Sequence, residues 1–311
     1  APQDVGARNR LGACQLKQGL LGGCIASFEA SLALQPEDNP ATVGLFAARQ
    51  MTCDWDGFDA LETQVNRLTD AAIAAGRACV EDPFMHVTRC ADPARNFAVA
   101  RTWSAGIETA AAGMGVTFAH APRDHAPLRI GYLSSDFHDH ATAHLMLGLF
   151  AAHDRARISV HAYSCGGGEG GAYRQRIADD CDSFTDLAGL DAGAAARRIY
   201  GDSIDILVDL KGYTRHNRLD IAALRPAPVQ ATWLGFPGTS GAGFFDYIVT
   251  DSIVTPQDEA AVYSEAFAVM PHCYQVNNDG QEIAPGPISR AEAGLPEGGV
   301  VLASFNNTYK L

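Results

Sequence analysis

Residues 128–133 read Leu-Arg-Ile-Gly-Tyr-Leu, and this short apolar stretch is the first of a series that decides the fold. Segments of helical length and composition, at 142–152, 173–180 and 192–200, separate the earlier members of the series. Strands that alternate with helices in this way predict an α/β fold, in which helices cover both faces of a parallel sheet. The stretches predicted as strands are residues 128–133, 158–163, 204–210, 229–234, 247–250 and 300–304.

The loop after the first predicted strand is rich in groups that bind ligands or protons. Ligands of parallel sheets bind beyond the carboxyl ends of the strands, where this loop lies. One interpretation is a metal site on the His138/His140 pair. Another is a general acid or base histidine, whose pKa a neighbouring carboxylate raises. A polar loop with capping histidines is the third. The side chains concerned are Asp136, His138, Asp139, His140 and His144.

Later loops carry further candidates. Residues 209–215 follow the third predicted strand, and Pro237-Gly238 forces a turn after the fourth. Hydroxyl and amide groups at that turn, including Thr239, can donate hydrogen bonds to a ligand. Lys310 follows the last predicted strand and is a point charge suited to a diphosphate. The glycine-rich run 166–171 lacks the G-x-G-x-x-G spacing and is predicted to be a flexible loop.

The first 38 residues carry the signature of a tetratricopeptide repeat, which is a pair of antiparallel helices. Small residues at fixed positions let the two helices approach, an aromatic residue fills the gap, and a proline ends the second helix. The matching residues are Leu11, Gly12, Cys24, Phe28, Ser31 and Pro36. Residues 41–115 are predicted to be helical, and 120–127 to be a linker.

Composition limits the classes of partner. The net charge of −13 argues against binding to nucleic acid or to an anionic membrane, because both require a positive field. The eight cysteines form no C-x-x-C pair and fit a reducing cytosol better than a disulfide framework, so a cytoplasmic location is expected. The chain has no initiator methionine and no signal peptide, and its start is expected to be the middle of a longer chain.

Several of these segments together resemble glycosyltransferase family 41, the O-linked N-acetylglucosamine transferases. The most specific segment is 224–241, and the single repeat is the least specific. The resemblance implies tetratricopeptide repeats followed by a catalytic region of GT-B type, with two lobes. The matching segments are residues 128–132, 134–137 with His140, 212–214, 224–240, 305–306 and 309–310.

The same resemblance implies the domain boundaries. The first 38 residues are a tetratricopeptide-type repeat, and 39–127 are a helical transition and linker. A Rossmann-like first catalytic lobe occupies 128–298. Residues 299–311 begin a second lobe, which is truncated, so the isolated chain is expected to be inactive.

The implied activity is inverting transfer of N-acetylglucosamine from UDP-GlcNAc to Ser or Thr hydroxyls of protein acceptors. His140 stands at the position of the active-site histidine, and Lys310 at that of the lysine that holds the diphosphate. The general base remains open between His140, a water chain and the phosphate itself. Further substrate contacts are predicted at Asn307, Thr214, Pro237, Gly238 and Thr239.

Three departures from the animal enzymes indicate a bacterial-type homologue. Asn307 replaces a glutamine that contacts the nucleotide, and Tyr200 replaces a histidine. Asp139 replaces an asparagine before His140, a change expected to raise the pKa of the histidine.

Neither a cofactor nor a metal is expected. The predicted partners are UDP-GlcNAc and a protein or peptide acceptor, with self-association through the repeats and no nucleic acid or membrane. Two alternatives remain open. One is a metal-dependent hydrolase that uses His138 and His140, and the other is a non-catalytic binding module built on the repeats.

Overall fold

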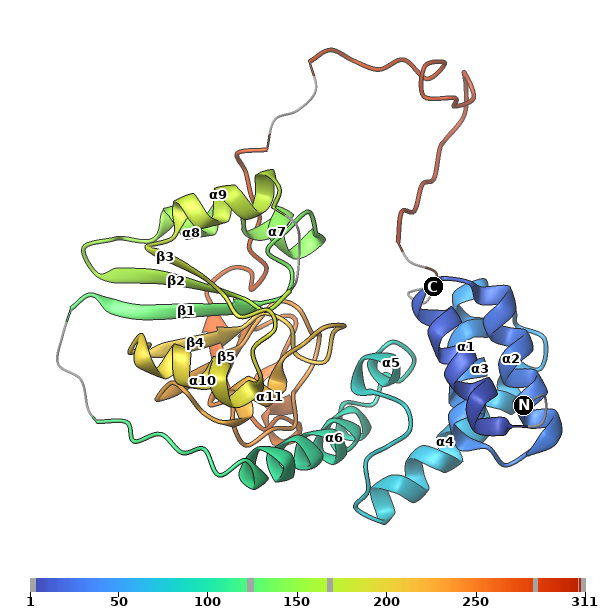
Figure 1. Ribbon diagram of the computed structural model, residues 1–311. Helices are drawn as coiled ribbons and strands as arrows, with labels where there is room; N and C mark the ends of the chain where they lie inside the picture. The colour runs from blue at the N-terminus through green and yellow to red at the C-terminus, as the bar shows by residue number, and fades with distance from the viewer. Residues whose placement is uncertain (1–3, 122–125, 167–169, 282–284, 307, 309–311) are drawn as a thin grey trace. The chain divides into compact units, whose positions relative to one another are not determined.

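The chain forms two compact units, which Figure 1 traces. The first comprises residues 1–62 and 279–311, and the second comprises 63–278. No helix in the described part of the chain is long and apolar enough to cross a membrane. The computed structural model describes residues 4–121, 126–166, 170–281, 285–306 and 308.

The first unit is built on three helices, α1 (Val5–Lys17), α2 (Leu21–Leu34) and α3 (Asn39–Thr52). Helix α4 (Phe58–Ala74) begins in this unit and continues into the second. The ring of Phe28 is buried against Gly12 on α1 and Gly44 on α3. A Cβ atom on Gly44 would lie 2.3 Å from this ring. Small residues and one aromatic side chain therefore set the helix spacing, as predicted from the repeat signature.

This close approach predicts that Gly44→Ala destabilises the first unit by about 1–2 kcal/mol. Overpacking costs about 1–3 kcal/mol, which exceeds the gain of up to ~1 kcal/mol in helix propensity. Gly106→Ala on α6 (Pro93–Gly113) is the matched control, because no atom lies within 4 Å of the added Cβ. The control is expected to stabilise its helix. Urea unfolding monitored by circular dichroism measures both changes, and a neutral Gly44→Ala would show that the helices can move apart.

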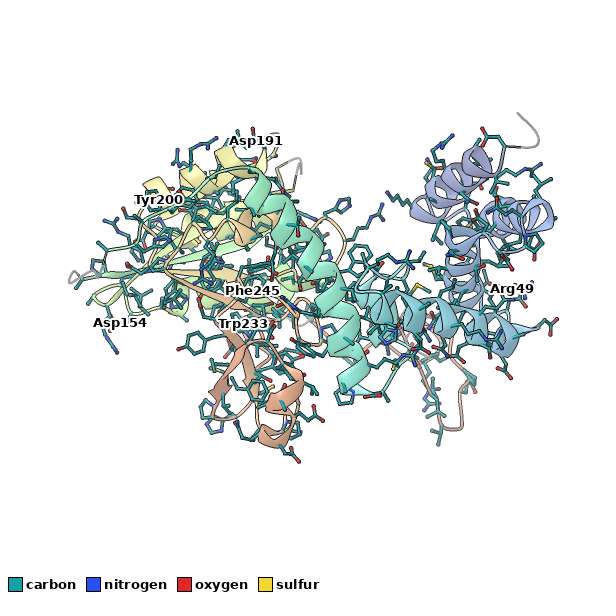
Figure 2. All side chains as sticks on the ribbon, turned by 90° about the horizontal axis from the view of Figure 1, so that it is seen from below. Arg49, Asp154, Asp191, Tyr200, Trp233 and Phe245 are labelled. Atoms are coloured by element: carbon teal, nitrogen blue, oxygen red, sulfur yellow. The ribbon has the colours of Figure 1, made fainter. Side chains whose placement is uncertain are left out.

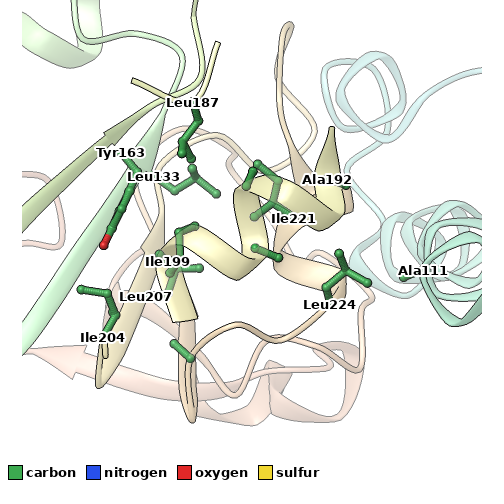
Figure 3. Packing of buried hydrophobic residues seen from close by; sticks show 13 residues of the cluster. Ala111, Leu133, Tyr163, Leu187, Ala192, Ile199, Ile204, Leu207, Ile221 and Leu224 are labelled. Carbon is green, nitrogen blue, oxygen red and sulfur yellow. The ribbon is translucent and has the colours of Figure 1, made fainter. Parts of the chain in front are cut away.

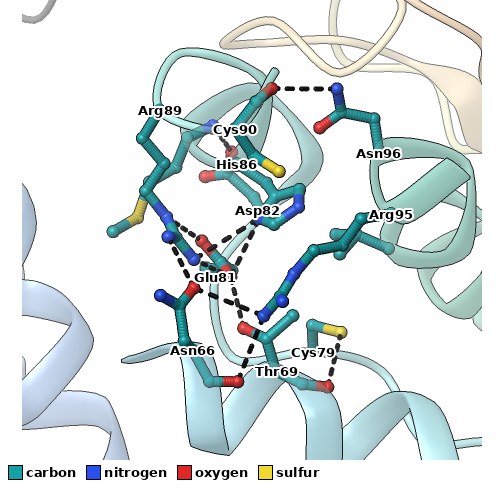
Figure 4. Close-up of polar contacts among 12 residues, drawn as sticks. Asn66, Thr69, Cys79, Glu81, Asp82, His86, Arg89, Cys90, Arg95 and Asn96 are labelled. Atoms are coloured by element: carbon teal, nitrogen blue, oxygen red, sulfur yellow. Dashed lines mark hydrogen bonds and ion pairs between the residues drawn. The ribbon is translucent and has the colours of Figure 1, made fainter. Parts of the chain in front are cut away.

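The helical part of the second unit is held by a buried polar cluster, drawn in Figure 4. Glu81 lies between α4 and the short helix α5 (Pro83–Val87) and is 1% exposed. Its carboxylate accepts hydrogen bonds from Nε and Nη2 of Arg89, at 2.9 and 2.6 Å, and from the hydroxyl of Thr69 on α4. Nδ1 of His86 lies 3.1 Å from the same carboxylate. A single acidic side chain thus joins α4 to α5.

The rest of the second unit is an α/β layer structure around one sheet, in the order β3-β2-β1-β4-β5-β6-β7. Each pair of neighbouring strands is parallel, as predicted. The strands are β1 (Leu128–Ser134), β2 (Ile158–Ser164), β3 (Ser183–Asp186), β4 (Ile206–Asp209), β5 (Val229–Thr232), β6 (Tyr247–Asp251) and β7 (Ala266–Met270).

Helices cover both faces because successive side chains of a strand point to opposite sides. Leu133 packs against α10 and α11 on one face, which Figure 3 shows, whereas Tyr132 packs against α7, α8 and α9 on the other. Helix α6 packs against α11. The sheet-covering elements are α7 (Ala141–Met146), α8 (Leu149–Ala152), α9 (Ala172–Asp180), α10 (Ala192–Gly201) and α11 (Leu219–Ala223). The 3₁₀ helix η1 (Gln257–Val262) contacts α6.

The predicted strand at 300–304 is wrong. These residues pair with no strand in the described part of the chain, and the side chains of Val300 and Leu302 are about nine-tenths exposed. An apolar run becomes a strand only where a neighbour satisfies its backbone groups. Strands β3 and β7 were not predicted. Both lie at sheet edges. Strand β3, Ser-Phe-Thr-Asp, has no apolar run, whereas β7, Ala-Phe-Ala-Val-Met, is apolar throughout and was missed despite that pattern.

Candidate active site

The sheet order brings three chemistry-bearing loops to one edge. Strands β1, β4 and β5 are adjacent and parallel, so the loops that follow them start side by side. These loops hold Asp136 and His140, Lys211 and Thr214, and the turn at Pro237. Gly212 has a φ of +51°, and its Cα lies so close to Phe236 that a Cβ would meet that side chain at 2.4 Å. The β4 and β5 loops are therefore packed tightly together.

An ion pair buried at this edge joins the β1 loop to the β4 loop. Nζ of Lys211 lies 2.7 Å from Oδ1 and 2.6 Å from Oδ2 of Asp136. Both residues are almost fully buried. The hydroxyls of Ser135 and Thr142 also donate to the Asp136 carboxylate, at 3.1 and 3.4 Å. Asp136 is thus fully engaged by protein groups.

Asp209, the last residue of β4, shapes the backbone that carries Lys211. Its Oδ2 accepts hydrogen bonds from the amides of Lys211 and Gly212, at 3.2 and 2.6 Å. Its Oδ1 has no partner among the described residues. Burial raises the pKa of Asp209 to about 6, although the two amides oppose the shift. The sequence presented Asp209 and Lys211 as part of a loop but did not indicate that Lys211 faces Asp136.

His140 is the N-cap residue of α7. Its Nδ1 accepts a hydrogen bond from the amide of Thr142 at 3.2 Å and lies 3.4 Å from Oδ2 of Asp136. Burial lowers the pKa of His140 below its ordinary value, Asp136 opposes this, and Lys211 reinforces it. The pKa is therefore lowered and not raised as expected, because burial outweighs the raising effect of Asp136.

Asp139 does not act on His140 as predicted. Its Oδ1 lies 2.8 Å from Nε2 of His144, whose Nδ1 faces the hydroxyl of Tyr173 at 3.1 Å. Nδ1 of His138 lies 3.2 Å from the carbonyl oxygen of Asp139. His138 and His144 thus contact Asp139, whereas His140 faces the Asp136 carboxylate.

The turn after β5 is exposed at Pro237 and buried at Thr239. The hydroxyl of Thr239 donates to Glu265 at 2.7 Å, and the Ser240 amide donates to the same carboxylate at 2.8 Å. Thr239 therefore has a structural partner in this conformation, and substrate contacts at Pro237, Gly238 and Thr239 stay predictions. Thr214 is half-buried, and its hydroxyl donates to the carbonyl of Lys211 at 2.9 Å.

Tyr200 lies on α10, where Figure 2 labels it. Its hydroxyl donates to the carbonyl of Ala119, and its ring stacks on Phe118. Tyr200 thus anchors the segment that leads to the sheet. Two other predicted site residues, Asn307 and Lys310, lie outside the described residues.

In the described part of the chain, no three His, Cys, Asp or Glu side chains lie close enough together to hold a metal ion. The pair His138/His140, on which the hydrolase alternative depends, is engaged by Asp139 and Thr142 through Nδ1.

Comparison with known proteins decides between the remaining classes. The sequence model described as glycosyl transferase family 41 matches residues 53–286, which include the candidate site. The chain belongs to glycosyltransferase family 41.

Relatives in this family are much longer than the chain. A probable UDP-N-acetylglucosamine–peptide N-acetylglucosaminyltransferase of Arabidopsis thaliana, SEC, is 34% identical over 84% of this chain and 28% of its own length. A UDP-N-acetylglucosamine–peptide N-acetylglucosaminyltransferase of Caenorhabditis elegans is 43% identical over 50% of this chain and 14% of its own. The chain thus spans less than a third of these two relatives.

A solved O-GlcNAc transferase structure has a similar architecture. A mutant O-GlcNAc transferase of Thermobaculum terrenum superposes with a TM-score of 0.68 and 25% sequence identity. The match covers 92% of this chain and 55% of the other. The chain therefore shares its helical region and α/β sheet with a solved O-GlcNAc transferase.

Proposed function

We propose that the full-length protein transfers N-acetylglucosamine from UDP-GlcNAc to Ser or Thr hydroxyls of protein acceptors, with inversion. The observation that carries this proposal is the family 41 match over residues 53–286. The names of two relatives state a UDP-N-acetylglucosamine donor and a peptide acceptor. The sheet serves as the first lobe of a GT-B enzyme.

The proposed reaction balances as a single displacement. The acceptor oxygen bonds to the anomeric carbon of the sugar, the bond from that carbon to the diphosphate oxygen breaks, and UDP leaves with the electron pair. The acceptor proton passes to a base. Lys310 balances the negative charge that develops on the diphosphate, so no metal or other cofactor is required. Asn307 contacts the nucleotide.

His140 is suited to donate a hydrogen bond at this edge. The Thr142 amide can donate only to a lone pair, so Nδ1 of His140 carries no hydrogen, and neutral imidazole then holds it on Nε2. In this form His140 offers substrate an Nε2–H donor. The general base is accordingly a water chain or the phosphate.

The helical unit is proposed to hold acceptor peptides as a tetratricopeptide-type surface. Leu11 and Leu20 of its first hairpin are more than half exposed and supply apolar area for self-association. All eight cysteines are free, which supports a cytoplasmic location.

The test is transfer by the full-length protein. Mass spectrometry of a Ser/Thr peptide incubated with UDP-GlcNAc is expected to show one added N-acetylhexosamine, also in the presence of EDTA. Lys310→Ala is expected to lower turnover by ~10²-fold, the range for removal of one electrostatic stabiliser. Residues 1–311 alone are expected to transfer no sugar.

Two results would contradict the proposal. One zinc ion per chain, whose removal abolishes activity, would support the alternative of a metal-dependent hydrolase. A full-length protein that binds no UDP in calorimetry would favour the non-catalytic binding module.

A further inference from the structure

A buried lysine shares a carboxylate oxygen with the candidate catalytic histidine. Lys211 is 3% exposed, and its Nζ lies 2.6 Å from Oδ2 of Asp136. Nδ1 of His140 lies 3.4 Å from the same oxygen. Lys211 and His140 therefore compete for one acceptor, and the shorter distance belongs to the lysine.

The state of His140 depends on this competition. If Nδ1 donated to Asp136 it would need a hydrogen, and the Thr142 amide would lose its acceptor. If Nδ1 accepts a hydrogen bond from the Thr142 amide, the Asp136 carboxylate needs other donors. Those donors are Nζ of Lys211 and the hydroxyls of Ser135 and Thr142. Which ring nitrogen of a histidine carries the proton is set by the hydrogen bond that the other nitrogen makes.

We propose that Lys211 is a positioning residue, which pairs with Asp136 and thereby keeps His140 uncharged with its hydrogen on Nε2. The catalytic meaning of this state rests on the proposed function, since it presents the substrate with a donor. The protonation state itself is a property of the chain without substrate. Asp209 supports the Lys211–Asp136 ion pair. It accepts hydrogen bonds from the amides of Lys211 and Gly212 and so fixes the loop from which the lysine reaches Asp136.

Other charged groups around His140 do not substitute for the Lys211–Asp136 ion pair. His138 and His144 both disfavour a charge on His140, as Lys211 does. The Asp139 carboxylate is engaged by His144. Asp136 is thus the acidic group that favours a charge on His140, against the effect of burial, and Lys211 is the cation paired with it.

The experiment is a histidine titration by NMR on the ¹⁵N-histidine-labelled chain without substrate. Long-range ¹H–¹⁵N spectra identify the protonated ring nitrogen, and His140→Gln assigns the signal. The wild type is expected to show neutral His140 with its hydrogen on Nε2. Lys211→Met leaves Asp136 facing His140, so the ratio of charged to neutral His140 at pH 7 is expected to rise about tenfold.

Asp136→Asn provides a test of opposite sign. It leaves Lys211 without its counter-charge, so the pKa of His140 is expected to fall below the wild-type value. The double variant Lys211→Met/Asp136→Asn is expected to return close to wild type, which mere damage to the loop would not do. If Lys211→Met does not fold, Asp136→Asn still decides the sign.

An unchanged His140 signal in both single variants, or shifts in the same direction, would overturn the proposal. These spectra contain no UDP-GlcNAc, so a failed transfer assay would leave them valid. In the full-length enzyme, Lys211→Met should also move any pH dependence due to His140 to higher pH, and the double variant should restore it.

Discussion

Replacing Glu81 by alanine is expected to lower the free energy of unfolding of the second unit by about 3–5 kcal/mol. Removing one partner of a buried ion pair leaves the other charge without compensation in a region that water does not reach. Arg89, whose side chain is 5% exposed, would keep only its contacts outside the carboxylate, and His86 would lose a polar partner. Urea unfolding of the chain gives the difference.

The acid dependence of stability provides a second readout of the same residue. Burial raises the pKa of Glu81, but hydrogen bonds from His86 and Arg89 outweigh it and hold the pKa at about 2, below the ordinary 4.5. A lowered pKa means that the stabilisation is complete above pH 4.5 and is lost as the pH falls toward 2. Glu81→Ala should lose this part of the pH dependence.

Asp258→Ala is the control, because Asp258 is exposed on η1. Its effect is expected to stay within about 0.5 kcal/mol, as for ordinary surface substitutions. A loss below 1 kcal/mol for Glu81→Ala would show that the cluster finds water or other partners.

Removing the imidazole of His140 from the full-length protein is expected to lower the turnover of the proposed transfer by about 10²-fold. The Nε2–H donor would be lost at the edge where the sugar and diphosphate are proposed to bind, and one preorganised donor contributes about this much. His140→Asn is more informative than His140→Ala, because asparagine keeps a side-chain oxygen that can cap α7. Comparison of the two variants separates capping from chemistry.

The pH–rate profile distinguishes a donor from a base. Because the pKa of His140 is lowered, an acid limb caused by a histidine base would lie below pH 6.5 and vanish in His140→Asn. We expect the acid limb of the wild type to persist in that variant. Its disappearance would assign His140 as the general base. His138→Ala and His144→Ala are the controls and should lose less.

Local sequence predicted most of the sheet because interior parallel strands are buried on both faces and appear as apolar runs. Strands β1, β2, β4, β5 and β6 were found in this way. The edge strand β3, Ser-Phe-Thr-Asp, has no such run. Residues 300–304 have one without being a strand, because strand formation needs a partner that local sequence does not specify.

The candidate site was likewise predictable only where its residues lie in one short segment. His140 could be identified from its place after the first strand and from the family motif, since both lie in one short segment. The charged residues around His140 that come from distant segments could not be identified in this way. Lys211 is 75 residues from Asp136, and Glu265 is 26 residues from Thr239. Folding brings these charged groups together in a poorly solvated interior, where each pairing is decided by which side chains reach one another.

The sequence by itself determined the order of the elements and the family, and it predicted the edge of the sheet that carries the candidate site, because these depend on local periodicity and short motifs. The tertiary structure alone decided the ionisation of the site. Asp136, four residues from His140, favours a raised pKa of the histidine, but burial outweighs this effect, and Lys211 from the loop after β4 pairs with the carboxylate. Desolvation and pairing act through space, so the effect of a carboxylate close in sequence depends on burial and on residues that follow a different strand.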